Sequence, residues 1–317
     1  MNVFGYTVNG TQCSRLVFGA WAIGGAFTGK VDDKESLNTL AFAFENGISF
    51  FDTAPVYGNG HSEWLLGQFA QNKRTKIFIA TKGGISWKTH SSGQRVMEPY
   101  GSSKNLKREL EASLRRLNTD YIDLYQLHWP DPKTDIAETF ETLTQFQTEG
   151  SIRFIGVSNF ALSQLKQAKK YAEIIALQNQ YNLLSREVET ELLPFIEQED
   201  MYFLSYGSLA YGIFTGKFYP SYPFAENDWR KTGISPTNNY FIPSNFEHHL
   251  KQVNQLKVLA EELHCSPAQL AIAWLLRHPR IYPLVGAKTI GQIKDNIQAL
   301  QVNVTSEIEK ELDHVFT

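Results

Sequence analysis

The sequence predicts an α/β protein in which eight parallel strands close into a (β/α)8 TIM barrel. Short apolar runs rich in β-branched and aromatic residues alternate with segments of helical period, a pattern typical of an all-parallel sheet. Eight such runs are present, the number that closes a barrel. They occupy residues 16–19, 48–51, 77–81, 121–127, 154–157, 174–177, 202–206 and 282–286. A doubly wound open sheet is the alternative, but the segment from Gly19 to Gly24 lacks the G-x-G-x-x-G pattern that usually marks its phosphate site.

The segments between the runs carry signals for the ends of helices. Ser266-Pro267 places a proline at a first helical turn, where its missing N–H costs nothing. Leucines at helical spacing predict an amphipathic helix after Ser103, namely Leu106, Leu110, Leu114 and Leu117. Asn9-Gly10 predicts the turn of an N-terminal β-hairpin. A long loop, residues 218–243, follows the seventh strand, and a loop of that length inside a compact domain is usually functional.

Composition favours a soluble cytoplasmic protein in which residues 1–317 form one barrel domain. The net charge of −3, without blocks of like charge, gives no reason to expect nucleic acid or a membrane surface as a partner. No apolar stretch reaches the ~18 residues of a membrane span, and the start lacks the pattern of a signal peptide. Cys13 and Cys265 lie outside any metal-ligand spacing, so we expect no metal site and a reducing compartment. The oligomeric state is left open.

Polar residues end three successive apolar runs. Asp52 follows the second run with Tyr57 shortly after it, Lys82 follows the third and His128 the fourth. Because barrel active sites form at the carboxyl ends of the strands, we expect these four side chains to converge. A lysine ammonium lowers the pKa of a neighbouring tyrosine, an aspartate holds the ammonium, and a neutral histidine can orient a substrate oxygen. This set suits carbonyl reduction, or alcohol oxidation in reverse, with a cofactor supplying hydride.

The later strand ends carry groups of a different kind. Ser158, Asn159 and Gln178 are neutral donors and acceptors suited to an amide, and Tyr206 offers a flat ring for stacking. The segment 286–289, Gly-Ala-Lys-Thr, opens the helix after the last strand. A glycine, a lysine and a helix N-terminus together predict an anion site.

These segments resemble the signatures of the aldo-keto reductases, in order and over nearly the whole chain. The matching segments are 52–58 (DTAPVYG), 80–82 (ATK), 123–128 (DLYQLH), 156–159 (GVSN), 206–209 (YGSL), 214–217 (FTGK) and 286–296 (GAKTIGQIKDN). Segments 128–132 (HWPDP) and 180–183 (QYNL) look like the bacterial general-stress and inositol-locus branch.

The resemblance implies Tyr57 as general acid, Lys82 and Asp52 as its tuning pair, and His128 as the group that orients the carbonyl. It implies NADPH as cofactor, although glutamine at position 292, where the family often has arginine, leaves NADH open. The implied cofactor-binding residues are Trp21, Asp52, Ser158, Asn159, Gln178, Tyr206, Gly207, Ser208, Leu209, Lys217, Gly286, Lys288, Thr289, Gln292 and Asn296.

The partner we expect is a small carbonyl substrate bound at an aromatic mouth. Its candidate contacts are Trp21, Tyr57, Trp87, His128 and Trp129, with Tyr219, Tyr222 and Trp229 from the long loop.

Two alternative functions belong to other classes of protein. A nucleotide-sensing module, similar to potassium-channel β-subunits, would bind the cofactor with little turnover. A barrel lyase or hydrolase would need paired carboxylates or a metal cluster that the strand ends lack.

Overall fold

Eight parallel strands form a closed barrel in the computed structural model, which describes residues 7–8, 11–25, 31–89, 95–226, 228–233 and 238–316. Each barrel strand pairs with its neighbours in chain order, and the last strand pairs with the first, which confirms the predicted fold class. The barrel strands are β3 (Val17–Gly19), β4 (Phe50–Asp52), β5 (Phe78–Gly83), β8 (Ile122–Leu127), β9 (Ile152–Ser158), β10 (Ile174–Gln180), β11 (Tyr202–Tyr206) and β12 (Ile281–Val285).

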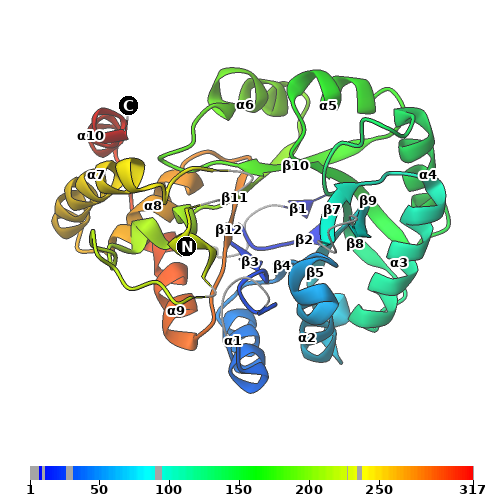
Figure 1. Cartoon of the computed structure of the whole chain (residues 1–317), viewed down its shortest axis with the longest axis horizontal. Helices are drawn as coiled ribbons and strands as arrows, with labels where there is room; N and C mark the ends of the chain where they lie inside the picture. The colour runs from blue at the N-terminus through cyan, green and yellow to red at the C-terminus, as the bar shows by residue number, and fades with distance from the viewer. Residues whose placement is uncertain are drawn as a thin grey trace.

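Helices surround the strands as an outer ring (Figure 1). The α-helices are α1 (Asp33–Glu45), α2 (His61–Ala70), α3 (Ser103–Leu117), α4 (Ile136–Thr148), α5 (Leu162–Ala168), α6 (Val188–Gln198), α7 (Pro243–Glu262), α8 (Pro267–Leu276), α9 (Ile290–Gln298) and α10 (Ser306–Phe316). Short 3₁₀ segments are η1 (Tyr57–Gly60), η2 (Arg74–Lys76), η3 (Ala210–Thr215), η4 (Trp229–Lys231) and η5 (Ala299–Gln301). The predicted proline at the start of α8 is confirmed, and Ser266 caps that helix. None of the described helices is long and apolar enough to cross a membrane.

Two antiparallel strand pairs lie outside the barrel. At the N-terminus β1 (Thr7–Val8) pairs with β2 (Thr11–Gln12), as predicted, although the turn residues themselves lie outside the described residues. The second pair, β6 (Ile85–Thr89) with β7 (Arg95–Pro99), follows β5 directly and was not predicted. Its strands mix Lys, Arg and Glu with apolar residues and end in a proline, so they lack the apolar runs by which the barrel strands were recognised.

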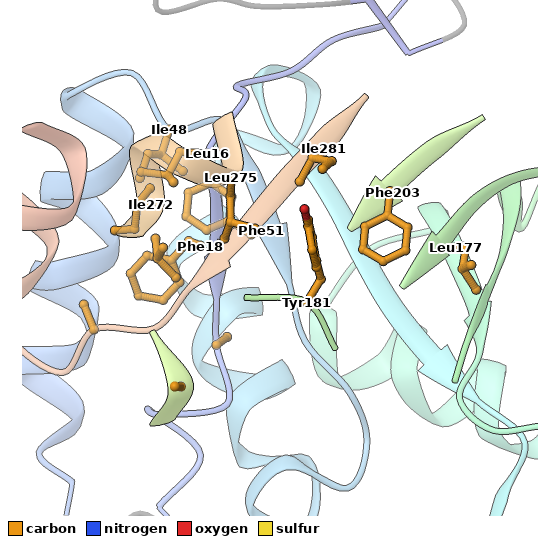
Figure 2. Packing of buried hydrophobic residues seen from close by; sticks show 14 of the residues in the cluster. Leu16, Phe18, Ile48, Phe51, Leu177, Tyr181, Phe203, Ile272, Leu275 and Ile281 are labelled. Atoms are coloured by element: carbon orange, nitrogen blue, oxygen red, sulfur yellow. The ribbon is translucent and has the colours of Figure 1, made fainter. Parts of the chain in front are cut away.

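Successive strand residues face opposite sides of the barrel wall. Phe50 belongs to the cluster that fills the barrel interior, with its ring 4.7 Å from that of Phe78. The next residue, Phe51, packs outward against the helices, and Figure 2 shows it near Phe18 in that outer layer. Because side chains alternate with period two, Asp52 returns to the interior above Phe50. The same alternation carries the interior face of β4, β5 and β8 from an apolar residue to Asp52, Lys82 and Gln126.

Helices α2 and α3 approach closely at Gly67, and this contact gives a test of the packing. A Cβ at Gly67 would lie 2.5 Å from the backbone oxygen of Arg116, which no side-chain rotation relieves. We expect Gly67→Ala to lower the free energy of unfolding in urea by about 1–3 kcal/mol. Gly291→Ala is the control, because that helical glycine meets no other atom closer than 3.9 Å, and it should be neutral or slightly stabilising. Equal losses in the two variants would contradict this account.

Candidate active site

A fully buried ion pair lies at the carboxyl end of the barrel interior. Lys82 Nζ donates to Asp52 Oδ1 at 2.6 Å and to the backbone oxygen of Thr53 at 3.0 Å. Burial lowers the pKa of Lys82, while the charge of Asp52 and the hydrogen bond to it act in the opposite direction. The predicted partnership between these two residues is therefore present, and Asp52 favours the charged ammonium.

Tyr57 reaches the same ammonium from the loop after β4. Its Oη lies 3.4 Å from Lys82 Nζ. The loop approaches the barrel so closely at Gly58, where φ is 61°, that a Cβ would lie 2.0 Å from the backbone oxygen of Gly24. Only glycine fits at this point, and the tight turn directs Tyr57 to the lysine.

The prediction that Lys82 lowers the pKa of Tyr57 is wrong. Burial first, and the charge of Asp52 second, raise the pKa of Tyr57 well above 10. A phenolate here would lose its hydration and face a carboxylate, and both effects favour the phenol. Tyr57 is therefore protonated near pH 7 and would give up its proton only to a strong base.

His128 completes a tetrad with Asp52, Tyr57 and Lys82. Its ring stands nearly perpendicular to that of Tyr57, with 6.2 Å between the centroids, and its backbone N–H donates to the oxygen of Gly83 at 2.9 Å. Burial, and then the charge of Lys82, lower the pKa of His128 well below 6.5. The histidine is therefore neutral near pH 7, as expected from the sequence.

Two buried glutamines donate hydrogen bonds to the second carboxylate oxygen of Asp52, Oδ2. Gln126 Nε2 and Gln178 Nε2 donate to Asp52 Oδ2 at 3.0 and 2.9 Å, and Gln178 also donates to Gln126 Oε1 at 3.2 Å. Gln178 was a candidate from the sequence, whereas Gln126 was overlooked. Its signal was available, because Gln126 follows the interior residue Leu124 by two positions in β8.

The amide-type candidates connect to His128 through hydrogen bonds. Asn159 Nδ2 donates to the backbone oxygen of His128 and to Ser158 Oγ, both at 3.0 Å. Tyr206 Oη donates to Asn159 Oδ1 at 2.8 Å, and Ser158 Oγ donates to the backbone oxygen of Gln178. The structure thus brings Ser158, Asn159, Gln178 and Tyr206 to one side of the tetrad.

Cations from three distant segments gather beside the start of α9. Burial, and then the charge of Arg230, lower the pKa of both Lys217 and Lys288. Arg230, in η4, was overlooked because it lies inside the long loop, away from the strand ends where candidates were sought. Asp228 holds its guanidinium by two hydrogen bonds, of 2.9 and 2.6 Å, and its Nη1 donates to the backbone oxygen of Tyr211. Three cations around one carboxylate leave excess positive charge, which suits an anion.

The remaining candidates at the start of α9 are arranged on its backbone. Thr289 caps the helix, accepting from the backbone N–H of Gln292 at 3.3 Å. Gln292 Oε1 turns back to accept from the backbone N–H of Lys288, and Asn296 Nδ2 donates to the oxygen of Gly286.

Three further candidates follow β11. Gly207 adopts a positive φ of 67°, Ser208 is buried with its Oγ bonded to the oxygen of Ser205, and Leu209 is half-buried before η3.

Aromatic side chains form a wall from the first strand to the long loop. Tyr211 makes edge contacts with Trp21 at 6.2 Å and with Trp229 at 5.3 Å between ring centroids. Trp129 is half-buried directly after His128, whereas Trp87 is exposed on the β6–β7 hairpin. Tyr219 and Tyr222 pack against each other. Trp21 and Trp229 therefore share one wall, and Trp87 belongs to a separate element.

The fold and this cluster define a (β/α)8-barrel protein with a candidate active site at the carboxyl ends of its strands. Among the described residues, no group of three or more His, Cys, Asp or Glu side chains is placed to hold a metal ion. The chain belongs to the aldo/keto reductase family, whose model matches residues 15–316, and this confirms the resemblance found in the sequence.

Individual relatives cover nearly the whole chain. Aldo-keto reductase YhdN of Bacillus subtilis is 37% identical over 315 residues, covering 96% of this chain and 91% of that protein. The NADH-specific methylglyoxal reductase of Escherichia coli is 32% identical over 304 residues, covering 92% and 91%. The solved structure of glycerol dehydrogenase AKR11B4 from Gluconobacter oxydans matches with a TM-score of 0.89 at 34% identity, covering 99% and 95%.

The amide contact to Asp52 can be tested by removing one of its donors. Gln126→Leu keeps most of the volume but leaves a buried carboxylate with one hydrogen bond fewer and one N–H of the Gln178 amide without its acceptor. We expect the free energy of unfolding in urea to fall by about 1–3 kcal/mol. Gln167→Leu, at an exposed position of α5, is the matched control and should change little. An unchanged stability of the Gln126 variant would mean that Asp52 does not depend on this amide.

Proposed function

We propose that the protein reduces aldehydes or ketones to alcohols with NADPH as hydride donor and Tyr57 as general acid. The observation that carries this proposal is the contact of 3.4 Å between Tyr57 Oη and a fully buried Lys82 that is paired with Asp52. His128, neutral and beside Tyr57, would donate a hydrogen bond to the carbonyl oxygen and orient it.

The high pKa of Tyr57 suits an acid that acts only when charge develops on the substrate. When hydride reaches the carbonyl carbon, the oxygen becomes an alkoxide, a much stronger base than a phenolate. Tyr57 Oη then gives up its proton, and the resulting phenolate lies beside the ammonium of Lys82, which stabilises it. Asp52, held by Gln126 and Gln178, keeps that ammonium in place.

The residues present fit a nicotinamide dinucleotide, whose bound nicotinamide ring would supply the hydride. Asn159, Ser158 and Gln178 offer the neutral donors and acceptors that a carboxamide needs, and the half-buried ring of Tyr206 lies among them. Lys217, Arg230 and Lys288 supply positive charge for its phosphates. Of the other expected contacts, Trp21 packs against Tyr211, and the rest border these two groups along the chain, namely Gly207, Ser208, Leu209, Gly286, Thr289, Gln292 and Asn296.

The choice between NADPH and NADH rests on the cations near α9. Lys288 can pair with the 2′-phosphate that distinguishes NADPH, and Arg230 adds to the charge around it. Gln292, by contrast, is neutral and engaged with the backbone. NADH use stays open, because the E. coli relative is named as NADH-specific.

Tyr57→Phe is expected to remove nearly all turnover while leaving NADPH binding intact, because only the proton donor is lost. Aldehyde-dependent loss of NADPH absorbance measures turnover, and quenching of tryptophan fluorescence measures binding. Tyr171→Phe, at an exposed position, is the control. Retained turnover in the Tyr57 variant would contradict the assignment of the acid. Tight nucleotide binding without turnover in the unmodified protein would instead favour a nucleotide-sensing module.

Lys288→Ala is expected to weaken NADPH binding about tenfold or more, since a charge-assisted hydrogen bond contributes about 1.5–3 kcal/mol, and to change NADH binding little. Arg230→Gln should weaken both nucleotides similarly if Arg230 faces the shared pyrophosphate. Fluorescence titrations at two salt concentrations give the dissociation constants. Lys294→Gln, exposed on α9, is the control. Equal losses for the two nucleotides in the Lys288 variant would contradict a 2′-phosphate contact.

A further inference from the structure

The first turn of α2 holds the ends of three neighbouring barrel strands from outside the barrel. Ser62 Oγ donates to the backbone oxygen of Ala20, which follows β3, and lies 2.8 Å from the Oγ1 of Thr53, which follows β4. The next residue, Glu63, accepts a hydrogen bond of 2.6 Å at its Oε1 from Thr81 Oγ1 in β5. Two consecutive side chains of one helix therefore fix the carboxyl ends of β3, β4 and β5.

The contacts of α2 to β4 and β5 lie next to the buried ion pair of the tetrad. Alternation along β5 directs Lys82 into the barrel and Thr81 outwards to α2. Asp52 and Thr53 divide in the same way at the end of β4, and the backbone oxygen of Thr53 accepts from Lys82 Nζ. Each of these contacts therefore lies one residue from a member of the ion pair.

Glu63 is itself fully buried and forms a second ion pair. Its Oε2 accepts from Arg116 Nε of α3 at 2.6 Å. Arg116 also packs against η1, the tight turn that begins at Tyr57, since a Cβ at Gly60 would lie 2.5 Å from Arg116 Cδ. The arginine side chain thus contacts both Glu63 and the turn that carries Tyr57.

Glu63 consequently connects the two segments whose side chains meet in the tetrad. Its Oε1 holds Thr81 beside Lys82, and its Oε2 holds the arginine that packs on the turn of Tyr57. The separation of Tyr57 Oη from Lys82 Nζ is 3.4 Å, which is long for a hydrogen bond. A small displacement of either segment would therefore change this contact.

We propose that Glu63 is a positioning residue for the reduction, which sets the separation of Tyr57 Oη from Lys82 Nζ. It acts from outside the barrel wall, through its hydrogen bonds to Thr81 and Arg116. The catalytic part of this proposal rests on the proposed function, whereas the positioning of the two side chains does not.

The charge of Glu63 favours the same arrangement as its hydrogen bonds. Burial lowers the pKa of Lys82, whereas the charge of Asp52, the hydrogen bond to Asp52 and then the charge of Glu63 raise it. Carboxylates on both sides of the barrel wall therefore favour the ammonium form of Lys82. That form is the one that would stabilise a phenolate of Tyr57.

Thr81→Val and Thr81→Ser test the connection without removing a charge. Valine keeps the shape of threonine but cannot donate to Glu63, whereas serine keeps the hydroxyl. In Thr81→Val, kcat for aldehyde reduction should fall about tenfold or more, because a misplaced proton donor slows the chemical step. KM and the dissociation constant of NADPH should stay unchanged, and Thr81→Ser should retain the kcat of the unmodified protein. An unchanged kcat in Thr81→Val would overturn the catalytic part of the proposal.

Glu63→Gln tests the ion pair, and Asp123→Asn is its matched control. The glutamine keeps an oxygen for Thr81, but its amide nitrogen would face Arg116 Nε, so two donors would meet. Asp123 is also a buried carboxylate paired with an arginine, 2.7 Å from Arg74, but near the amino end of β8. Both variants should unfold at lower urea concentrations, whereas only Glu63→Gln should lower kcat. Equal losses of kcat in the two variants would overturn a specific role for Glu63.

A resonance of Tyr57 reports the positioning without any turnover. In protein labelled with ¹³C at the Cζ of tyrosine, the signal of Tyr57 is the one that is lost in Tyr57→Phe, and its chemical shift depends on the hydrogen bonds and charges at Oη. This signal should move in Glu63→Gln and Thr81→Val but not in Asp123→Asn. An unmoved signal in both of the first two variants would overturn the proposal. If the unmodified protein reduces no aldehyde, the proposed function fails, and the resonance still decides the positioning.

Discussion

The buried ion pair between Lys82 and Asp52 is the constraint on which the rest of the site depends. Two charges in the barrel interior are tolerated only when each finds hydrogen-bond partners, because desolvation otherwise exceeds their attraction. The structure supplies those partners from separate strands. Gln126 and Gln178 hold the second oxygen of Asp52, and the backbone oxygen of Thr53 accepts from the ammonium. The polar layer at the top of the barrel thus exists to keep this pair, and the layer below it can remain apolar.

That division explains why so much of the site could be predicted from the sequence. In β4 the interior residues run from Phe50 to Asp52, and in β5 from Phe78 to Lys82, so a charge appears where an apolar pattern of period two would continue. The same rule identifies Gln126, which was overlooked because a neutral amide inside an apolar strand attracts less notice than a charge. The barrel itself could be predicted from the number and spacing of the apolar runs.

Other parts of the site depend on contacts that no local pattern encodes. Lys288 lies far along the chain from Lys217 and Arg230, and only the folded loop brings their charges together. The pKa of Tyr57 was predicted in the wrong direction because the sequence reveals its neighbours but not its loss of hydration. The β6–β7 hairpin escaped notice since its pairing is stabilised by Glu109 and Asn105 on α3 rather than by an apolar face of its own.

The β6–β7 hairpin and the long loop lie outside the barrel wall but contact the segments that carry the tetrad and its surroundings. The hairpin begins at Ile85, three residues after Lys82, and the oxygen of Gly83 between them accepts from the backbone N–H of His128. Tyr211 contacts both Trp21 and Trp229, so aromatic contacts join the long loop to the loop that follows β3. Neither element contributes to the apolar cluster inside the barrel, so both can change without loss of that core. The hairpin borders the tetrad through the backbone at Gly83, and the long loop contacts the loop after β3 through Tyr211. The tetrad can therefore be kept while the sequences of these two elements vary, provided that the contacts at α3 and at Tyr211 remain.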